Sequence, residues 1–173
     1  MTTSEPTTTE THSISLTVNG RTVGDTVEPR LSLADFLRKR LSLVGTHLGC
    51  EQGACGACTI LVDGQSVRSC LVLAVQADGS TIETVEGLAD GGELHPLQEA
   101  FRQTQGLQCG YCTPGMLMRS LELIRDNPTS TAEEAREGVA SNLCRCTGYQ
   151  YIVEAVVEAA ANQAGTQPSP DRG

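Results

Sequence analysis

GCEQGACGACT, residues 49–59, carries three cysteines within nine residues, interleaved with three glycines. A fourth cysteine follows after eleven intervening residues, which completes the set Cys50, Cys55, Cys58 and Cys70. The spacing C-x4-C-x2-C…C is typical of plant-type ferredoxins, in which four thiolates hold one [2Fe–2S] cluster. The stretch therefore predicts an iron–sulfur site, and the surrounding half of the chain is expected to fold around it.

The glycines support this interpretation. Because glycine reaches positive φ without strain, Gly49, Gly53 and Gly56 are expected to let the loop curl and aim backbone N–H groups at the sulfurs. The two alternatives for four cysteines are less suited to this pattern. Structural zinc sites usually show two C-x2-C knuckles, and a disulfide framework requires an exported protein.

The second set of four cysteines is more ambiguous. It has the pattern C-x2-C followed, after a long gap, by C-x-C, and its members are Cys109, Cys112, Cys144 and Cys146. A redox dithiol, a zinc site and a second cluster all remain possible from spacing alone. The helical surroundings disfavour a thioredoxin-like dithiol, and a single residue between two ligands is tight for one zinc tetrahedron.

Composition bounds the remaining possibilities. The length of 173 residues and the two separate cysteine sets indicate two small domains, each of which a metal site would stabilise. With no Trp, two Phe and three Tyr, the cores of these domains are expected to be aliphatic. The net charge of −9 argues against nucleic acid as a partner, and the basic run 38–40 is expected to be a solvated helix face. Residues 1–13 show no export signal, and no apolar run is long enough to span a membrane, so the cytoplasm is the expected location.

Local patterns predict an α+β first half over residues 13–88. Strands are expected on either side of the turns Asn19-Gly20 and Asp63-Gly64, with another at 81–85. Ser32 is expected to cap a helix whose apolar residues continue to Leu41, and 72–77 is a helix or a strand. Residues 1–12 are expected to form a disordered tail.

The second half, residues 92–163, shows helical periodicity after Gly91-Gly92. Helices are expected from Pro96, from Thr113 as N-cap, from the capping box 131–134, and over the apolar face that begins at Ile152. The cysteine pairs lie at two of the turns between these helices, which predicts a four-helix bundle around the second site. Residues 164–173 are expected to be a second disordered tail.

Two further stretches decide the second site. QCGYCTPG (108–115) and SNLCRCTGY (141–149), downstream of GCEQGACGACT, resemble the iron–sulfur subunit of the molybdenum hydroxylases, the family of xanthine oxidase, aldehyde oxidoreductases and carbon monoxide dehydrogenase. The resemblance runs from about residue 14 to residue 160 and covers all eight cysteines. It implies a plant-ferredoxin-like β-grasp domain followed by an all-α four-helix domain, each with one [2Fe–2S] cluster.

The resemblance also implies a function. The chain is expected to be a non-catalytic electron-transfer subunit of an oxidoreductase, passing single electrons from molybdopterin on a large subunit, through both clusters, to FAD on a medium subunit. The helical-domain cluster would be nearer molybdenum and the ferredoxin-like cluster nearer FAD. Gln108 and Cys146 are candidates for direct contact with the pterin. A heterotrimer, or a dimer of heterotrimers, is the expected assembly.

The remaining residues offer little support for a catalytic role of the chain's own. With all eight cysteines assigned there is no free thiol for a nucleophile, and the three histidines are expected to be surface or loop residues. Tyr111 and Tyr149 are expected to pack over the clusters. The alternatives are a free-standing two-cluster ferredoxin, which would purify without partner chains, and a zinc-stabilised interaction module, which would contain no iron.

Overall fold

Two tight turns organise the sheet in the computed structural model, which describes residues 10–166. Asn19 and Gly20, with φ of 47° and 77°, join β1 (His12–Val18) to β2 (Arg21–Val27). Asp63 and Gly64, with φ of 51° and 83°, join β3 (Thr59–Val62) to β4 (Gln65–Arg68). Both hairpins confirm the sequence prediction, because left-handed φ at both central residues is what the type I′ turn requires.

The fifth strand, β5 (Thr81–Glu83), completes the sheet at its centre. The strand order is β2-β1-β5-β3-β4, with β5 parallel to β1 and antiparallel to β3. Short 3₁₀ turns connect the strands: η2 (Ser69–Leu71) and η3 (Ala74–Ala77) lie between β4 and β5, and η4 (Val85–Gly87) follows β5. The segment 72–77, expected as a helix or a strand, is thus mostly a 3₁₀ turn.

The helix after Ser32 differs from the expected regular helix. Ser32 Oγ accepts the backbone N–H of Asp35, as a cap should, but α1 (Leu33–Asp35) gives way at once to a π-helical turn, η1 (Phe36–Arg40). Leu33, Phe36 and Leu37 are fully buried against the sheet. Wider π turns are often found near functional sites, and this one directs the chain into the cysteine-rich loop.

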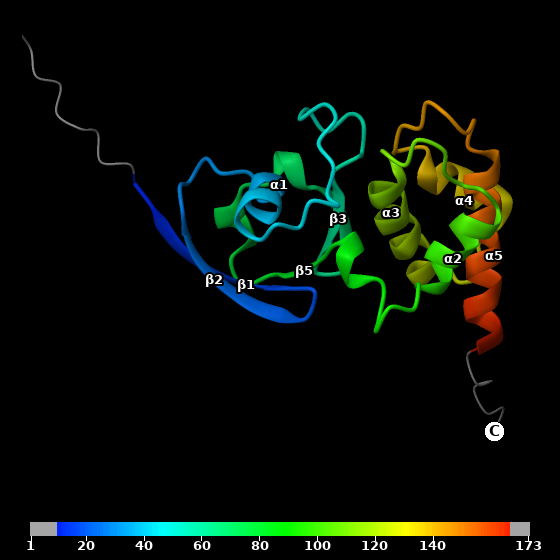
Figure 1. The fold of residues 1–173 in the computed structure, drawn as a ribbon, viewed down its shortest axis with the longest axis horizontal. Helices are drawn as coiled ribbons and strands as arrows, with labels where there is room; N and C mark the ends of the chain where they lie inside the picture. Colours follow the sequence, from blue (N-terminus) through cyan, green and yellow to red (C-terminus); the bar gives the residue numbers. More distant parts are fainter. Residues whose placement is uncertain (1–9, 167–173) are drawn as a thin grey trace, which may run out of the picture.

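Four helices form the second half (Figure 1). They are α2 (Pro96–Gln103), α3 (Thr113–Asp126), α4 (Ala132–Val139) and α5 (Gln150–Thr166). Thr131 and Glu134 form the predicted capping box before α4. The start of α3 was predicted one residue too late, since Cys112 is its N-cap and Thr113 its first residue. The α+β class with a separate helical part is confirmed.

The two halves pack against each other through β3 and α3, which lie side by side in Figure 1. Ile60 belongs to the core of the sheet, whereas its neighbour Leu61 is buried in the helical core. Successive strand residues point to opposite faces, so β3 serves both cores at once. The cysteine loop that precedes β3 is therefore placed beside the first turn of α3.

Two elements extend slightly into the predicted tails. β1 begins at His12, the last residue of the predicted first tail, and α5 continues to Thr166, within the predicted second tail. Of the other predicted tail residues, 1–9 and 167–173 lie outside the described residues. Within residues 10–166, no helix is long and apolar enough to cross a membrane.

Candidate metal centres

The first set of cysteines is assembled by the β3–β4 hairpin. Cys50, Cys55 and Cys58 lie in the loop between η1 and β3, and Cys70 lies in η2 directly after β4. Ser69 fastens the two ends together, because its N–H and its hydroxyl both donate to the carbonyl of Cys58, over 3.3 and 2.7 Å. The hairpin therefore returns the fourth cysteine to the first three.

The loop curls around its own sulfur atoms. Gly53 and Gly56 have φ of 76°, as predicted, but Gly49 does not adopt positive φ, and Glu51 (φ 53°) takes the third left-handed position. The backbone N–H groups of Gln52 and Cys55 donate to Cys50 Sγ over 3.4 and 3.3 Å. These two donors, Gln52 first, lower the pKa of the Cys50 thiol to about 7, which favours the thiolate that binds metal.

The second set lies at two neighbouring turns of the helical half. Cys109 and Cys112 lie between α2 and α3, while Cys144 and Cys146 lie between α4 and α5. Cys109 and Cys146 are exposed, and the other two are partly buried. Burial, and next the side chain of Cys144, raises the pKa of the Cys112 thiol to about 12.

All eight cysteines are free, and the members of each set lie close together: after burial, Cys58 and Cys50 raise the pKa of the Cys70 thiol, and Cys144 and Cys109 raise the pKa of the Cys112 thiol. A [2Fe–2S] cluster needs four cysteine sulfurs gathered in one place, two for each iron. A structural zinc instead needs all four ligands around one ion.

Asn142 joins the two sites. Its side chain is 1% exposed, and its amide nitrogen donates to the Gly56 carbonyl over 3.0 Å and to Thr59 Oγ1 over 3.2 Å. The next residue, Leu143, donates its backbone N–H to the carbonyl of Cys55 over 2.8 Å. Cys55 of the first set is therefore one hydrogen bond away from the residue that precedes Cys144 of the second set.

Two more contacts hold the sites together. Tyr111, next to Cys112, donates its hydroxyl to the Leu48 carbonyl over 2.7 Å, and its ring stacks on His47 at 4.8 Å between centroids. A Cβ on Gly115, in the first turn of α3, would lie 2.4 Å from the carbonyl oxygen of Gly56. Tyr111 was expected to pack over a cluster, and its hydrogen bond across the two halves was not foreseen.

Arg38 is another residue whose role sequence analysis missed. One of its guanidinium nitrogens donates to the carbonyls of Val44 and Thr46, over 2.7 and 2.8 Å. Glu86 holds the same segment from the other side by accepting the N–H of Gly45 over 2.7 Å. The basic run 38–40 was interpreted as a solvated helix face, but its first member fixes the entry to the cysteine loop.

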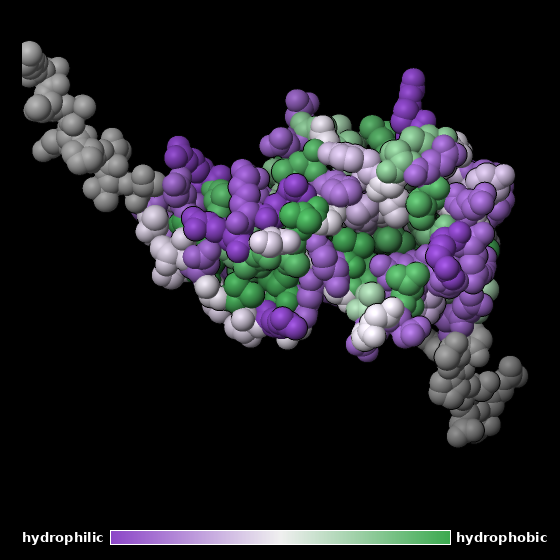
Figure 2. Space-filling view, viewed as in Figure 1, coloured by the Kyte–Doolittle hydropathy of each residue, from purple (hydrophilic) through white to green (hydrophobic). Residues whose placement is uncertain are grey.

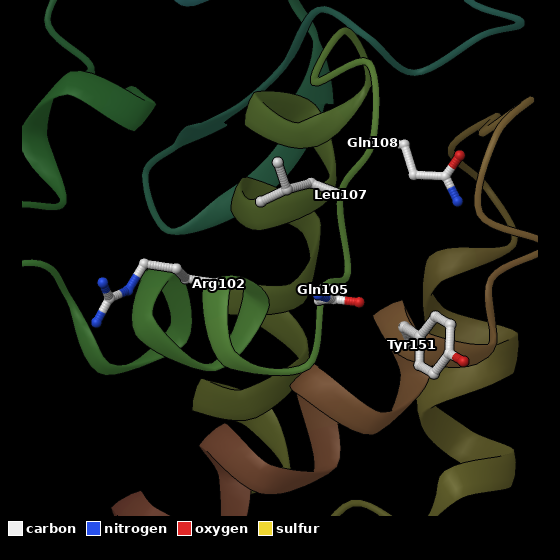
Figure 3. Close-up of a pocket in the computed structure, with 5 residues that line it drawn as sticks. All are labelled: Arg102, Gln105, Leu107, Gln108 and Tyr151. Atoms are coloured by element: carbon white, nitrogen blue, oxygen red, sulfur yellow. The ribbon is translucent and has the colours of Figure 1, made fainter.

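Gln108 lines a shallow open pocket of about 310 Å³ with Arg102, Gln105, Leu107 and Tyr151. In Figure 3 the Gln108 side chain points toward the loop that leads into α5, on the side of Tyr151. Gln108 and its neighbour Cys109 are both exposed, and so is Cys146. The three residues thus form part of the surface, where another molecule can reach them.

Large apolar side chains are exposed near both sites. Leu107, Tyr111, Leu143 and Tyr151 are 40–59% exposed beside the second set, and Leu71, directly after Cys70, is 60% exposed beside the first. Figure 2 shows one face of the molecule, where green hydrophobic groups interrupt the purple hydrophilic surface. Exposed apolar groups that gather around a site are typical of surfaces that bind a partner.

Comparisons with known proteins find an iron–sulfur domain in each half of the chain. Two family models match: "2Fe-2S iron-sulfur cluster binding domain" over residues 16–92 and "[2Fe-2S] binding domain" over residues 84–157. The nicotine 6-hydroxylase small subunit of Paenarthrobacter nicotinovorans is 58% identical over 84% of this chain and 88% of its own length. The caffeine dehydrogenase subunit gamma of Pseudomonas sp. (strain CBB1) is 55% identical over 84% of this chain and 89% of its own length.

Among solved structures, one chain of quinoline 2-oxidoreductase from Pseudomonas putida 86 has the same fold, with a TM-score of 0.85. It is 51% identical to this chain, and the match covers 90% of this chain and 98% of that one.

Proposed function

The chain belongs to the [2Fe–2S] iron–sulfur subunits of the molybdenum hydroxylase family, and we propose that it carries electrons between a molybdopterin-bearing subunit and an FAD-bearing subunit. The observation that carries this proposal is that the fold gathers the eight free thiols into two sets of four, linked by the hydrogen bond between Leu143 and Cys55. A [2Fe–2S] cluster, when bound, takes up and releases one electron with little rearrangement. The protein contributes distance, burial and hydrogen bonds.

We assign one cluster to each set of thiolates. The ligands nearer FAD would be Cys50, Cys55, Cys58 and Cys70, and the ligands nearer molybdenum would be Cys109, Cys112, Cys144 and Cys146. The exposure of Cys109 and Cys146 supports this direction, because an electron donor on another chain must approach closely. Gln108 and Cys146 would contact the pterin, and the exposed position of both side chains supports this role.

The domain boundaries follow the same division. We propose a ferredoxin-like domain over residues 13–88 and a helical domain over residues 92–163. The separate hydrophobic cores support the division, and the contribution of Leu61 to the helical core indicates that the two domains dock tightly. A fixed docking keeps the distance between the clusters constant.

The relatives reported above are subunits of larger enzymes, and this chain is therefore a subunit as well. We propose a heterotrimer with the large and medium subunits, or a dimer of heterotrimers, and we place it in the cytoplasm, where thiols stay reduced for metal binding. The three relatives reported above are named for nicotine, caffeine and quinoline. A nitrogen heterocycle is accordingly the proposed substrate of the complex, recognised by the large subunit.

A pair of cysteine variants tests the proposed path in the purified complex. Cys146→Ser should remove the EPR signal of the helical-domain cluster, leave the other signal intact, and slow the reduction of FAD by substrate. Cys50→Ser, the matched control, should remove the other signal instead. Reduction of FAD at the wild-type rate in the Cys146→Ser complex would show that electrons do not pass this site.

A free-standing ferredoxin is the competing function, and gel filtration separates the two. The subunit should elute with two larger chains that carry molybdenum and FAD. Elution of the chain by itself, at about its own mass of 18.3 kDa and with both clusters bound, would contradict the proposed assembly.

A further inference from the structure

Thr147 lies against the sulfur of Cys144. Its hydroxyl oxygen is 3.1 Å from Cys144 Sγ, and the same oxygen accepts the backbone N–H of Tyr149 over 3.1 Å. Tyr149 adopts a left-handed conformation (φ 69°) after Gly148 (φ 64°), which turns its N–H back toward the threonine. The Thr147 hydroxyl thus lies between the Cys144 sulfur and the Tyr149 N–H, a position that the cysteine spacing did not predict.

Tyr149 keeps this loop closed. Its phenolic oxygen accepts the N–H of Cys144 over 2.8 Å and donates to the carbonyl of Asn142 over 3.2 Å, while its ring packs against the helical core. Residues 142–149 therefore form a small loop with three internal hydrogen bonds to Tyr149. Thr147, partly buried inside it, has little freedom to turn its hydroxyl away from the sulfur.

We propose that the Thr147 hydroxyl donates a hydrogen bond to the sulfur of Cys144 and thereby raises the reduction potential of the helical-domain cluster. The inference rests on the proposed function, since it takes Cys144 as a cluster ligand. A ligating thiolate has no proton to give, so in the pair of atoms the hydroxyl must be the donor. The N–H of Tyr149 occupies a lone pair of the same oxygen, which leaves the O–H bond free for the sulfur.

The direction of the effect follows from charge. Reduction adds one negative charge to the cluster and its thiolates, and a donor aimed at a ligand sulfur stabilises the more negative state. The hydrogen bonds to Cys50 in the other set come from backbone N–H groups, which substitution of a side chain leaves in place. Thr147 is thus a positioning residue whose contribution can be removed by a single substitution.

The test is an EPR-monitored redox titration of the assembled complex with Thr147→Val and Thr147→Ser. Valine has the shape of threonine without the hydroxyl, and serine keeps the hydroxyl without the methyl group. At the wild-type midpoint potential, Thr147→Val should lower the ratio of reduced to oxidised helical-domain cluster about tenfold, which is 59 mV for a one-electron couple. Thr147→Ser should stay near the wild-type ratio, and the ferredoxin-like cluster should be unchanged in both.

An unshifted midpoint in Thr147→Val, or an equal shift in Thr147→Val and Thr147→Ser, would overturn the proposal. If Thr147→Val does not assemble its cluster, Thr147→Ala can replace it, because Thr147→Ala and Thr147→Ser differ only by the hydroxyl. An unshifted midpoint potential in Thr147→Ala would then overturn the proposal. Failure of the proposed function is distinguishable, because the chain would then purify without its molybdenum- and FAD-bearing partners, or FAD would be reduced at the wild-type rate in the Cys146→Ser complex, whatever the midpoint potential of Thr147→Val.

Discussion

Gly115 offers a sharp test of how the two halves are docked. It lies in the first turn of α3, and a Cβ at this position would meet the main chain of the first cysteine loop. The nearest atoms are the carbonyl oxygen of Gly56 at 2.4 Å and that of Ala57 at 2.9 Å. Unlike the end of a flexible side chain, these carbonyls cannot rotate away, because the loop is fixed by its hydrogen bonds to Cys50, Thr59 and Asn142.

Two opposing effects decide the outcome of Gly115→Ala. Alanine in place of glycine favours a helix by about 1 kcal/mol. To bring the new contact even to 3.0 Å, however, α3 and the loop must separate by about 0.6 Å, and such overpacking costs about 1–3 kcal/mol. Since the obstacle is backbone, we expect the upper part of that range, and thus a net loss of about 1–2 kcal/mol in unfolding free energy.

Gly138→Ala is the matched control. Gly138 is also helical, but a Cβ there would meet only the terminal methyl groups of Leu123, which can move aside. Urea unfolding followed by visible absorbance of the clusters should therefore show a lower midpoint for Gly115→Ala, and an equal or higher midpoint for Gly138→Ala. A Gly115→Ala protein as stable as wild type would refute the close docking of α3 on the cysteine loop.

Two other predictions concern the entry to the first cysteine loop and an ion pair between the two halves of the protein. Arg38→Met removes the donor to the Val44 and Thr46 carbonyls, so the ferredoxin-like cluster should be lost faster on mild heating. Arg40→Met, at an exposed neighbouring position, is the control and should lose the cluster at the wild-type rate. Equal rates of cluster loss in the two variants would contradict the role of Arg38. The ion pair between Glu83 on β5 and Arg125 on α3 holds the pKa of the Glu83 carboxyl below its usual 4.5, so its stabilisation is full above that pH and is lost as the pH falls through the lowered pKa. Because both groups are partly exposed, Glu83→Gln should lower the unfolding free energy by only about 0.5–1 kcal/mol near pH 7. The difference in urea midpoint between this variant and wild type should shrink as the pH falls toward 4. A difference that does not change with pH would exclude the ion pair as its source.

What could be predicted from the sequence was the local chemistry. The turns at Asn19-Gly20 and Asp63-Gly64 and the capping box at Thr131 follow from residues a few positions apart, and the structure has all three. The curl of the first cysteine loop was also foreseen, although its third left-handed residue is Glu51 rather than Gly49. In a loop this dense in glycine, spacing alone does not select which residues adopt positive φ.

What could not be predicted depends on residues that are distant along the chain. Asn142 and Gly56 are 86 positions apart, and their contact exists only because β3 and α3 pack together. Arg38 was misjudged for a similar reason, since its partners are carbonyl groups, which leave no trace in side-chain composition. The assembly of the second set of cysteines likewise needed the helical turns to be placed in space.

The most direct measurement is whether the chain holds two [2Fe–2S] clusters on its eight thiolates. It uses iron analysis and EPR spin quantitation of the full chain, purified with its partner subunits and reduced with dithionite. We expect about four iron per chain, no zinc, and two distinct signals that each integrate to about one spin. A single signal with about two iron, or zinc in place of iron at either set, would contradict this expectation.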